Sequence, residues 1–163
     1  MVNFYNERTV RWNDGTVVLI DQRKLPNRFT YIKCVDHIQI AKAIKDMNVR
    51  GAPAIGVAAA MGLALTAYNS KAKTKSELLT ELEVAGRELT ETRPTAANLS
   101  WGVKRIYNKV LKVDGDIDFL RQMIIREAEY MGDEDVANCK EIGRNGSSLL
   151  EDGDTVLTHC KWF

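Results

Sequence analysis

The 163-residue chain is long enough to bury one ordinary hydrophobic core, which predicts a single domain. Hydrophobic residues make up 45% and charged residues 28% of the chain, the balance of a soluble globular protein. The formal net charge of +1 argues against the strongly basic surface of a nucleic-acid-binding protein and against an acidic tail.

Neither export nor membrane insertion is expected. Residues 1 to 8 lack the apolar core of a signal peptide, and the longest apolar stretch, residues 52 to 67, is short for a membrane span. The three cysteines, Cys34, Cys139 and Cys160, are odd in number and widely spaced. That pattern fits a reducing compartment better than a disulfide framework, so we expect a cytoplasmic protein in which Cys34 and Cys139 lie in the core.

The start of the chain predicts a small antiparallel sheet. Residues 9 to 12 and 16 to 20 flank Asn13-Asp14-Gly15, where Gly15 can take the positive φ that a hairpin turn needs. A further turn at Pro26-Asn27 precedes residues 29 to 34, a third run of aromatic and β-branched residues.

Helical periodicity begins at Asp36, which resembles the start of a capping box because Gln39 follows three residues later. His37 is expected to be exposed in the first turn. A second helix begins near Pro53 and is so rich in alanine and glycine that neighbours can approach closely, which predicts a central position. The face of the first helix expected to be buried carries Ile38, Ala41, Ile44 and Met47.

Three more helices are predicted. One begins at Ser76, and the next runs from residue 95 to 111 after the interruption at Pro94. The last is a long segment capped by Asp116, with a kink expected at Gly132. The expected buried positions are Leu78, Leu82, Ala85 and Leu89 in the first of these, and Leu120, Ile124, Ala128, Met131, Val136, Cys139, Ile142 and Leu149 in the last.

Residues 155 to 158, Thr-Val-Leu-Thr, have the short apolar pattern of a buried parallel strand. The fold class is therefore expected to be α+β and mainly α, with a small N-terminal antiparallel sheet on a helical bundle. Residues 1–152 would form this N-terminal domain, with the sheet in 8–34 and the helices in 36–150. Residues 153–163 would begin a second domain.

The segment Arg50-Gly51-Ala52-Pro53 suits a phosphate. Arg50 offers a planar fork of N–H donors, and Gly51 lets the backbone come close to a ligand. Pro53 fits the first turn of a helix, whose backbone N–H groups would face the same anion. The alternative is a tight turn into a packed helix with Arg50 in solvent, and the local pattern leaves both open.

Arg93 repeats this arrangement, because it precedes Pro94 and a helix start at Thr95. Two such sites could clamp one phosphorylated sugar, although either arginine alone could simply lie at the surface. Cys160 follows the predicted strand, where α/β folds place ligands, yet a lone cysteine is more often a buried hydrophobe. His159 beside it would point to the opposite face, and no metal-site spacing or nucleotide-binding loop is present.

Three segments taken together resemble one enzyme family. Residues 50 to 65, 92 to 99 and 153 to 160 are similar, in the right order, to the methylthioribose-1-phosphate isomerases. Parts of residues 9 to 26 are similar to the start of the same enzymes. This family belongs with the initiation factor 2B-like regulatory subunits of the translation-initiation guanine-nucleotide exchange factor, and with ribose-1,5-bisphosphate isomerase.

The resemblance implies a function. The family converts 5-methylthioribose 1-phosphate to 5-methylthioribulose 1-phosphate in methionine salvage, and needs no cofactor or metal. It implies substrate-binding roles for Arg50, Gly51, Ala52 and Arg93, and a catalytic role for Cys160. The intact protein would be a homodimer, and its substrate would be a phosphorylated sugar. Asn98 and Trp101 are expected to pack near the pocket.

The family's catalytic aspartate and further substrate contacts lie in a second, Rossmann-like α/β domain, whereas this sequence ends after Lys161-Trp162-Phe163. We therefore expect the 163 residues alone to be inactive. Two alternatives are a non-catalytic regulatory subunit and ribose-1,5-bisphosphate isomerase. The Arg50 segment together with Cys160 favours the methylthioribose-1-phosphate isomerase over a regulatory scaffold.

Overall fold

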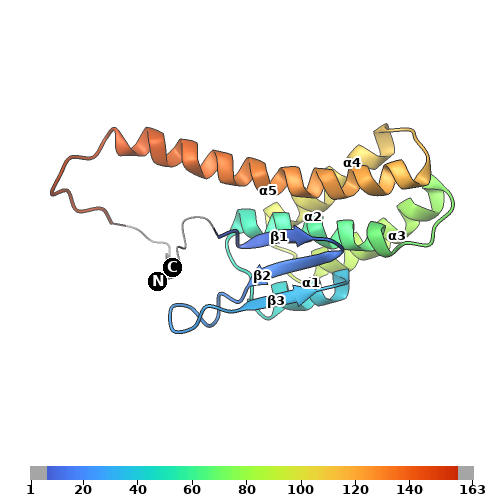
Figure 1. Ribbon diagram of the computed structural model, residues 1–163, viewed down its shortest axis with the longest axis horizontal. Helices are drawn as coiled ribbons and strands as arrows, with labels where there is room; N and C mark the ends of the chain where they lie inside the picture. Colours follow the sequence, from blue (N-terminus) through green and yellow to red (C-terminus); the bar gives the residue numbers. More distant parts are fainter. Residues whose placement is uncertain (1–6, 158–163) are drawn as a thin grey trace.

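The computed structural model describes residues 7 to 157 and has the expected α+β architecture, with a small antiparallel sheet against a bundle of helices (Figure 1). The strands pair in the order β1-β2-β3. The elements in chain order are β1 (Val10–Asn13), β2 (Thr16–Ile20), β3 (Tyr31–Cys34), α1 (His37–Lys45), α2 (Ala52–Asn69), α3 (Lys75–Glu91), α4 (Ala97–Lys112) and α5 (Ile117–Ser147).

The predicted hairpin is confirmed, and its turn packs on the helical layer. Asp14 and Gly15 both have positive φ, 43° and 75°, as a tight hairpin turn requires. A Cβ on Gly15 would lie 2.4 Å from the ring of Tyr68, near the end of α2. Trp12 meets the same ring edge to face, with ring centroids 5.7 Å apart. These aromatic contacts join the hairpin to α2.

Helix α2 is the centre of the molecule, as its small residues predicted. It contacts all four other helices and the first two strands. Its length and apolar composition would suit a membrane span, but 67% of that stretch is buried inside the fold, as in the core helix of a globular protein. Small residues let α4 approach α2 so closely that a Cβ on Gly102 would lie 2.4 Å from the carbonyl oxygen of Gly56.

The buried face of α1 differs from the predicted one. Ile38 is 63% exposed and Met47 lies beyond the helix end, while the buried residues of α1 are Ile40, Ala43 and Ile44. The helix has only nine residues, so two overlapping sets of apolar positions fit its periodicity equally well. Its start is as expected, because the side chain of Asp36 accepts a hydrogen bond from the Gln39 amide at 2.8 Å.

Helix α3 follows the prediction closely. All four residues of its expected face are buried. The helix begins at Lys75, one residue earlier than predicted, because Thr74 and Glu77 form a capping box that fixes the first turn. Helix α4 begins at Ala97, two residues later than predicted.

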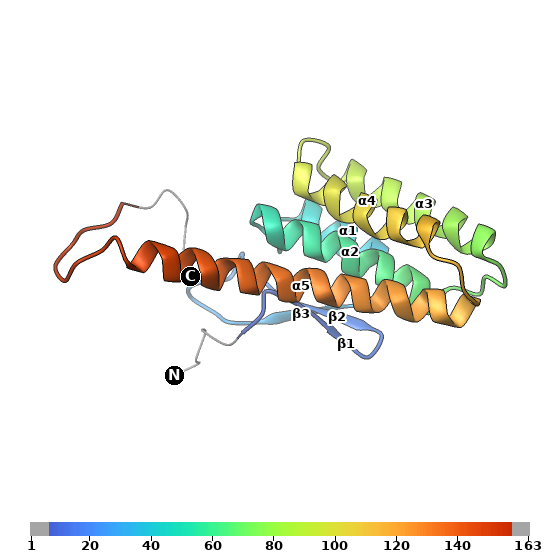
Figure 2. The same cartoon turned by 90° about the horizontal axis from the view of Figure 1, so that it is seen from above.

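Helix α5 is a single unbroken element, so the helix is not interrupted at Gly132. Its first half is packed, with Leu120, Ile124, Ala128 and Met131 buried. Its second half extends past the bundle (Figures 1 and 2). Cys139 is exposed there and Ile142 is 71% exposed, so the expectation that they are core residues was wrong. Cys34, in contrast, is buried as predicted.

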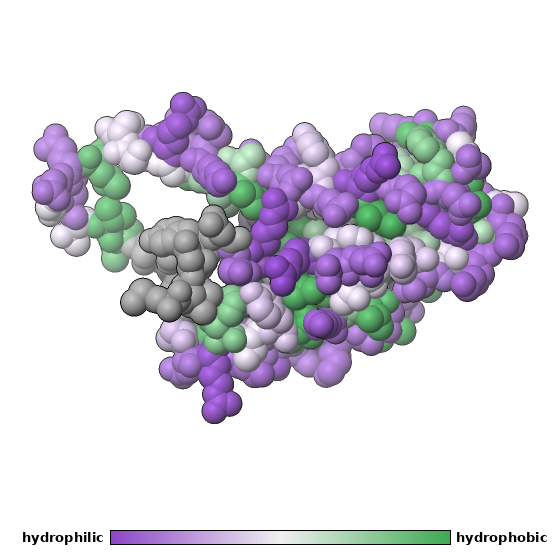
Figure 3. Space-filling model, viewed as in Figure 1, coloured by the Kyte–Doolittle hydropathy of each residue, from purple (hydrophilic) through white to green (hydrophobic). Residues whose placement is uncertain are grey.

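The strand predicted at residues 155 to 158 is not seen in its described part, residues 155 to 157. Val156 is 63% and Leu157 98% exposed, so the apolar pattern that suggested a buried strand has no covering layer within residues 7 to 157. Figure 3 shows apolar surface on this outlying part of the chain. The domain boundary proposed near residue 152 stays a prediction.

Candidate functional site

The residues Arg50 to Pro53 form the sharp entry into α2. Gly51 is the N-cap residue, with φ 93° and ψ 130°, and a Cβ placed on it would meet no atom within 4 Å. Glycine is therefore required by the backbone conformation and not by crowding. Gly51 and Ala52 are exposed, and Arg50 is half-buried. This geometry leaves the backbone at the helix start open to a ligand.

The starts of α2 and α4 share an unusual property. Neither N-cap residue, Gly51 or Ala96, gives the helix a side-chain hydrogen bond. The other helices of the described chain are capped by the side chains of Asp36, Thr74 and Asp116. The first amide groups of an α-helix have no partner inside the helix, so an uncapped start presents these donors and the positive end of the helix dipole.

These two helix starts lie side by side. A Cβ on Gly56, in the second turn of α2, would be 2.8 Å from the carbonyl oxygen of Asn98 in the first turn of α4. Figure 2 shows both helices running in the same direction, with α5 antiparallel to them. The fold therefore brings the segments that contain Arg50 and Arg93 to the same end of the bundle. Asn98 also lies at this end.

Arg93 occupies the turn between α3 and α4. Its amide donates to the carbonyl of Thr90 at 3.3 Å, and its carbonyl accepts from the Ala96 amide at 2.9 Å. The residue is half-buried. Within residues 7 to 157, its guanidinium makes no hydrogen bond or ion pair.

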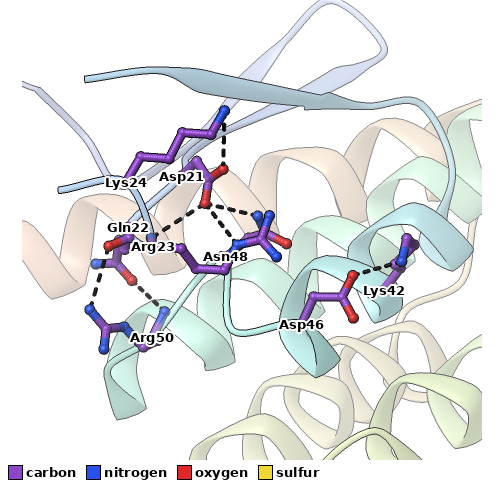
Figure 4. Close-up of polar contacts among 8 residues, drawn as sticks. All are labelled: Asp21, Gln22, Arg23, Lys24, Lys42, Asp46, Asn48 and Arg50. Atoms are coloured by element: carbon purple, nitrogen blue, oxygen red, sulfur yellow. Dashed lines mark hydrogen bonds and ion pairs between the residues drawn. The ribbon is translucent and has the colours of Figure 1, made fainter. Parts of the chain in front are cut away.

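Arg50 is held from the strand layer. Its amide donates to the side-chain oxygen of Gln22, and its Nη2 lies 3.5 Å from the Gln22 carbonyl oxygen (Figure 4). The amide of Gln22 in turn donates to the Asn48 carbonyl at 2.9 Å. Sequence reasoning missed Gln22, and the only signal was a polar pair, Asp21-Gln22, placed directly after a buried strand.

Asp21 is a buried carboxylate beside this segment, with its side chain 2% exposed. It accepts from Asn48 Nδ2 at 2.8 Å and from Arg23 Nε at 3.2 Å, and Lys24 Nζ lies 3.7 Å away. Burial alone would raise the pKa of Asp21, but the hydrogen bonds from Arg23 and Asn48 outweigh it and lower the pKa below its ordinary value. Asp21 is therefore ionised and structural at neutral pH.

The other predicted residues lie either outside the described part of the chain or elsewhere in the fold. Cys160 and His159 lie outside the described residues. His37 was expected to be exposed, but its ring is 20% exposed and lies 3.0 Å from Glu88 and 3.2 Å from Thr66. It joins α1 to α2 and α3. Trp101 is 51% exposed and lies over the Arg105 guanidinium, on the α4 surface that faces α5.

A hollow of about 900 Å³ between α4 and α5 contains none of the predicted site residues. Its buried Glu127 accepts from Arg105 at 2.8 Å and also from Lys109. Burial would raise the pKa of Glu127, but the bonds from the two cations outweigh it and lower the pKa. This network satisfies its own charges and joins the two helices. Among residues 7 to 157, no three His, Cys, Asp or Glu side chains gather as metal ligands would.

Comparison with known proteins finds relatives that are named methylthioribose-1-phosphate isomerases. The methylthioribose-1-phosphate isomerase of Pelotomaculum thermopropionicum is 46% identical over 154 residues, which are 93% of this chain and 42% of the relative. A putative methylthioribose-1-phosphate isomerase of Methanosarcina acetivorans is 42% identical over 155 residues, 94% of this chain and 44% of the relative.

Two solved structures share the fold. The 5-methylthioribose 1-phosphate isomerase of Pyrococcus horikoshii OT3 superposes with a TM-score of 0.85 at 44% identity, over 90% of this chain and 41% of that one. The delta subunit of translation initiation factor eIF-2B from A. fulgidus gives 0.82 at 41% identity, over 90% and 43%. The chain thus spans less than half the length of the relatives it matches.

The sequence profile of the initiation factor 2 subunit family matches residues 48–161. This range starts two residues before Arg50 and includes both uncapped helix starts. It covers well over half of the 163 residues. The chain therefore belongs to the initiation factor 2 subunit family.

Proposed function

We propose that this chain supplies the phosphate-binding part of an aldose–ketose isomerase, which converts 5-methylthioribose 1-phosphate to 5-methylthioribulose 1-phosphate. The observation that carries the proposal is the pair of uncapped helix starts, α2 and α4, that lie side by side with an arginine before each. The relatives named as this isomerase support the choice of reaction.

A phosphate fits this arrangement chemically. Its oxygens accept hydrogen bonds from backbone amides, and its charge is favoured at the positive ends of two helix dipoles. Gly51 removes the side chain where the phosphate would come closest to the backbone. Arg50 and Arg93 would add charge-assisted hydrogen bonds, which contribute about 1.5–3 kcal/mol each.

The substrate explains why the phosphate must be held firmly. A phosphate on C1 blocks the simple opening of the sugar ring to a free aldehyde, so hydrogen has to move between C2 and C1 in a sheltered site. By resemblance, Cys160 would act there with an aspartate from the family's second domain as the acid/base or polarising pair. We also propose a cytoplasmic location and a homodimer for the intact protein.

A second candidate is a non-catalytic regulatory subunit. The A. fulgidus structure named as an initiation-factor subunit is nearly as similar as the P. horikoshii isomerase, so the fold alone fits both functions. The two differ in chemistry, because a regulatory scaffold has no need of a phosphate site joined to a reactive cysteine.

The test is turnover by the intact protein. The isomerase proposal predicts formation of the ketose from 5-methylthioribose 1-phosphate, and a loss of kcat in Cys160→Ser with substrate binding retained. Absence of both turnover and substrate binding in a folded protein would contradict it and favour the regulatory subunit.

A further inference from the structure

Arg50 lies in the short connection between α1 and α2, outside any helix or strand. A guanidinium on such a connection can point in many directions, because the arginine side chain has several rotatable bonds and loses rotamer entropy when it is fixed. If Arg50 binds phosphate, something must hold both its backbone and its side chain. Gln22 contacts both.

We propose that Gln22 is a positioning residue that aims Arg50 at the substrate phosphate; this rests on the proposed function. Its side-chain oxygen accepts the Arg50 amide, which fixes the backbone just before Gly51. Its own carbonyl oxygen accepts Nη2 of Arg50 at 3.5 Å, which restrains the guanidinium. The two contacts act at opposite ends of the same residue and so set its direction (Figure 4).

Gln22 can do this because it is itself fixed. It lies two residues after the end of β2, and its backbone amide donates to the Asn48 carbonyl at 2.9 Å. The preceding residue, Asp21, holds the other end of Asn48 through the 2.8 Å bond from Nδ2. Asn48 is 3% exposed and Asp21 1% exposed, so water does not compete with this bond. The central strand is thereby joined to the connection that carries Arg50.

The acidic side chains near Gln22 are paired with cations of the same chain. The Asp21 carboxylate pairs with Arg23 and Lys24, and the neighbouring Asp46 pairs with Lys42 at 2.6 Å. Gln22 is uncharged. A neutral amide can therefore hold the backbone of Arg50 without adding a negative charge beside the phosphate, whereas a carboxylate in its place would repel it.

The test is a double-mutant cycle on the intact protein, with Gln22→Met, Arg50→Ala and the double variant. Methionine keeps the length of glutamine, but its thioether sulfur accepts hydrogen bonds only weakly in place of the amide oxygen. Gln22→Met alone should raise KM for 5-methylthioribose 1-phosphate on the order of tenfold with kcat little changed, since a misaimed arginine weakens phosphate binding. In the Arg50→Ala background, Gln22→Met should raise KM by less than about twofold.

Gln39→Met is the matched control. Gln39 also accepts a backbone amide, that of Val35 at 3.1 Å, but it lies at the start of α1 and does not contact Arg50. It should leave KM unchanged. Equal effects of Gln22→Met with and without Arg50, or an effect no larger than that of Gln39→Met, would overturn the positioning role. If Arg50→Ala itself left KM and kcat unchanged, the proposed function would fail instead.

Discussion

At the residue scale, the site depends on a few side chains and on one backbone conformation. Gly51, with φ 93°, turns the chain into α2 in a way that other residues rarely adopt. Arg50 precedes it and is fixed by Gln22, while Arg93 is placed by the turn before α4. The same few residues thus set the backbone direction and the charge.

The first prediction concerns the two arginines. Arg50→Ala and Arg93→Ala in the intact protein should each lower kcat/KM by roughly ten- to a hundredfold, because each removes a charge-assisted hydrogen bond to phosphate. Arg50→Lys should restore little, since an ammonium does not reproduce the planar fork. Steady-state kinetics measure this. Arg87→Ala, at an exposed position of α3, is the control, and equal kinetics in all these variants would contradict the assignment.

The second prediction concerns Asp21, whose pKa in the fold lies below its ordinary value of 3.8. Its ionised form therefore stabilises the fold above that value, and the contribution is lost as pH falls through the folded pKa. Asp21→Asn should lower the free energy of unfolding by about 1–3 kcal/mol at pH 7. The difference from wild type should shrink below about pH 4.

Urea unfolding at several pH values measures this difference. Asp152→Asn, at an exposed position, is the control and should leave stability unchanged at every pH. A deficit in Asp21→Asn that stayed constant down to the lowest pH would show that the carboxylate charge is not what stabilises the segment.

At the element scale, the crossing of α2 and α4 determines whether the two helix starts meet. Gly56 and Gly102 allow backbone to approach backbone, which brings the first turns together. Larger residues at this crossing would separate the helices by pushing on main-chain atoms, which cannot move aside as a flexible side chain can.

The third prediction tests this crossing. Gly102→Ala should destabilise the fold by about 1–3 kcal/mol, because the new Cβ would lie 2.4 Å from a backbone oxygen. Gly143→Ala in the exposed part of α5 is the matched control, since a Cβ there meets nothing within 4 Å. It should stabilise the helix by up to about 1 kcal/mol through helix propensity. Thermal melts compare the two, and equal shifts of Tm would contradict this account.

The elements also show what sequence patterns can and cannot predict. The face of α3 followed from periodicity because the helix is long, and the hairpin followed from Asp14-Gly15. Which face of the short α1 is buried depends on the elements that pack against it, and the apolar periodicity of the sequence does not contain that information. Residues 137 to 145 of α5 are exposed, so their apolar positions are not covered by the described part of the chain and Ile142 was wrongly predicted to be buried.

The candidate site shows the same division. Arg50 and Arg93 could be proposed from the sequence because each carries its own local signature, an arginine before a helix start. The meeting of the two helix starts and the contact between Gln22 and Arg50, on which its proposed role rests, join residues far apart in the chain. No local pattern around residue 22 could indicate that it contacts Arg50.

At the scale of the whole molecule, the second half of α5 forms an overhang that extends past the bundle. This overhang lies toward the end where α2 and α4 begin (Figure 2). Gly132 of α5 faces Val57 near the start of α2. A Cβ placed on Gly132 would lie 3.5 Å from the Val57 side chain. Exposed apolar residues follow on this outlying part of the chain, namely Ile142, Leu149, Leu150, Val156 and Leu157. The candidate site and the apolar overhang therefore share one side of the molecule.

The fourth prediction is that the 163 residues alone show no isomerase activity on 5-methylthioribose 1-phosphate. By resemblance, the catalytic aspartate belongs to the family's second domain, and the loss of one member of a cooperating catalytic set removes most of the rate. A ketose assay on the purified chain measures this. Formation of the ketose at an enzymatic rate would contradict the prediction.

The central claim is that the starts of α2 and α4 form one phosphate site with Arg50 and Arg93. A crystal structure of the intact protein with its substrate or product bound tests this most directly. We predict the phosphate within hydrogen-bond distance of the Arg50 guanidinium and of backbone amides at the start of α2, with Arg93 on its other side. A phosphate bound elsewhere, for example at the lysines of residues 71 to 75, would contradict it.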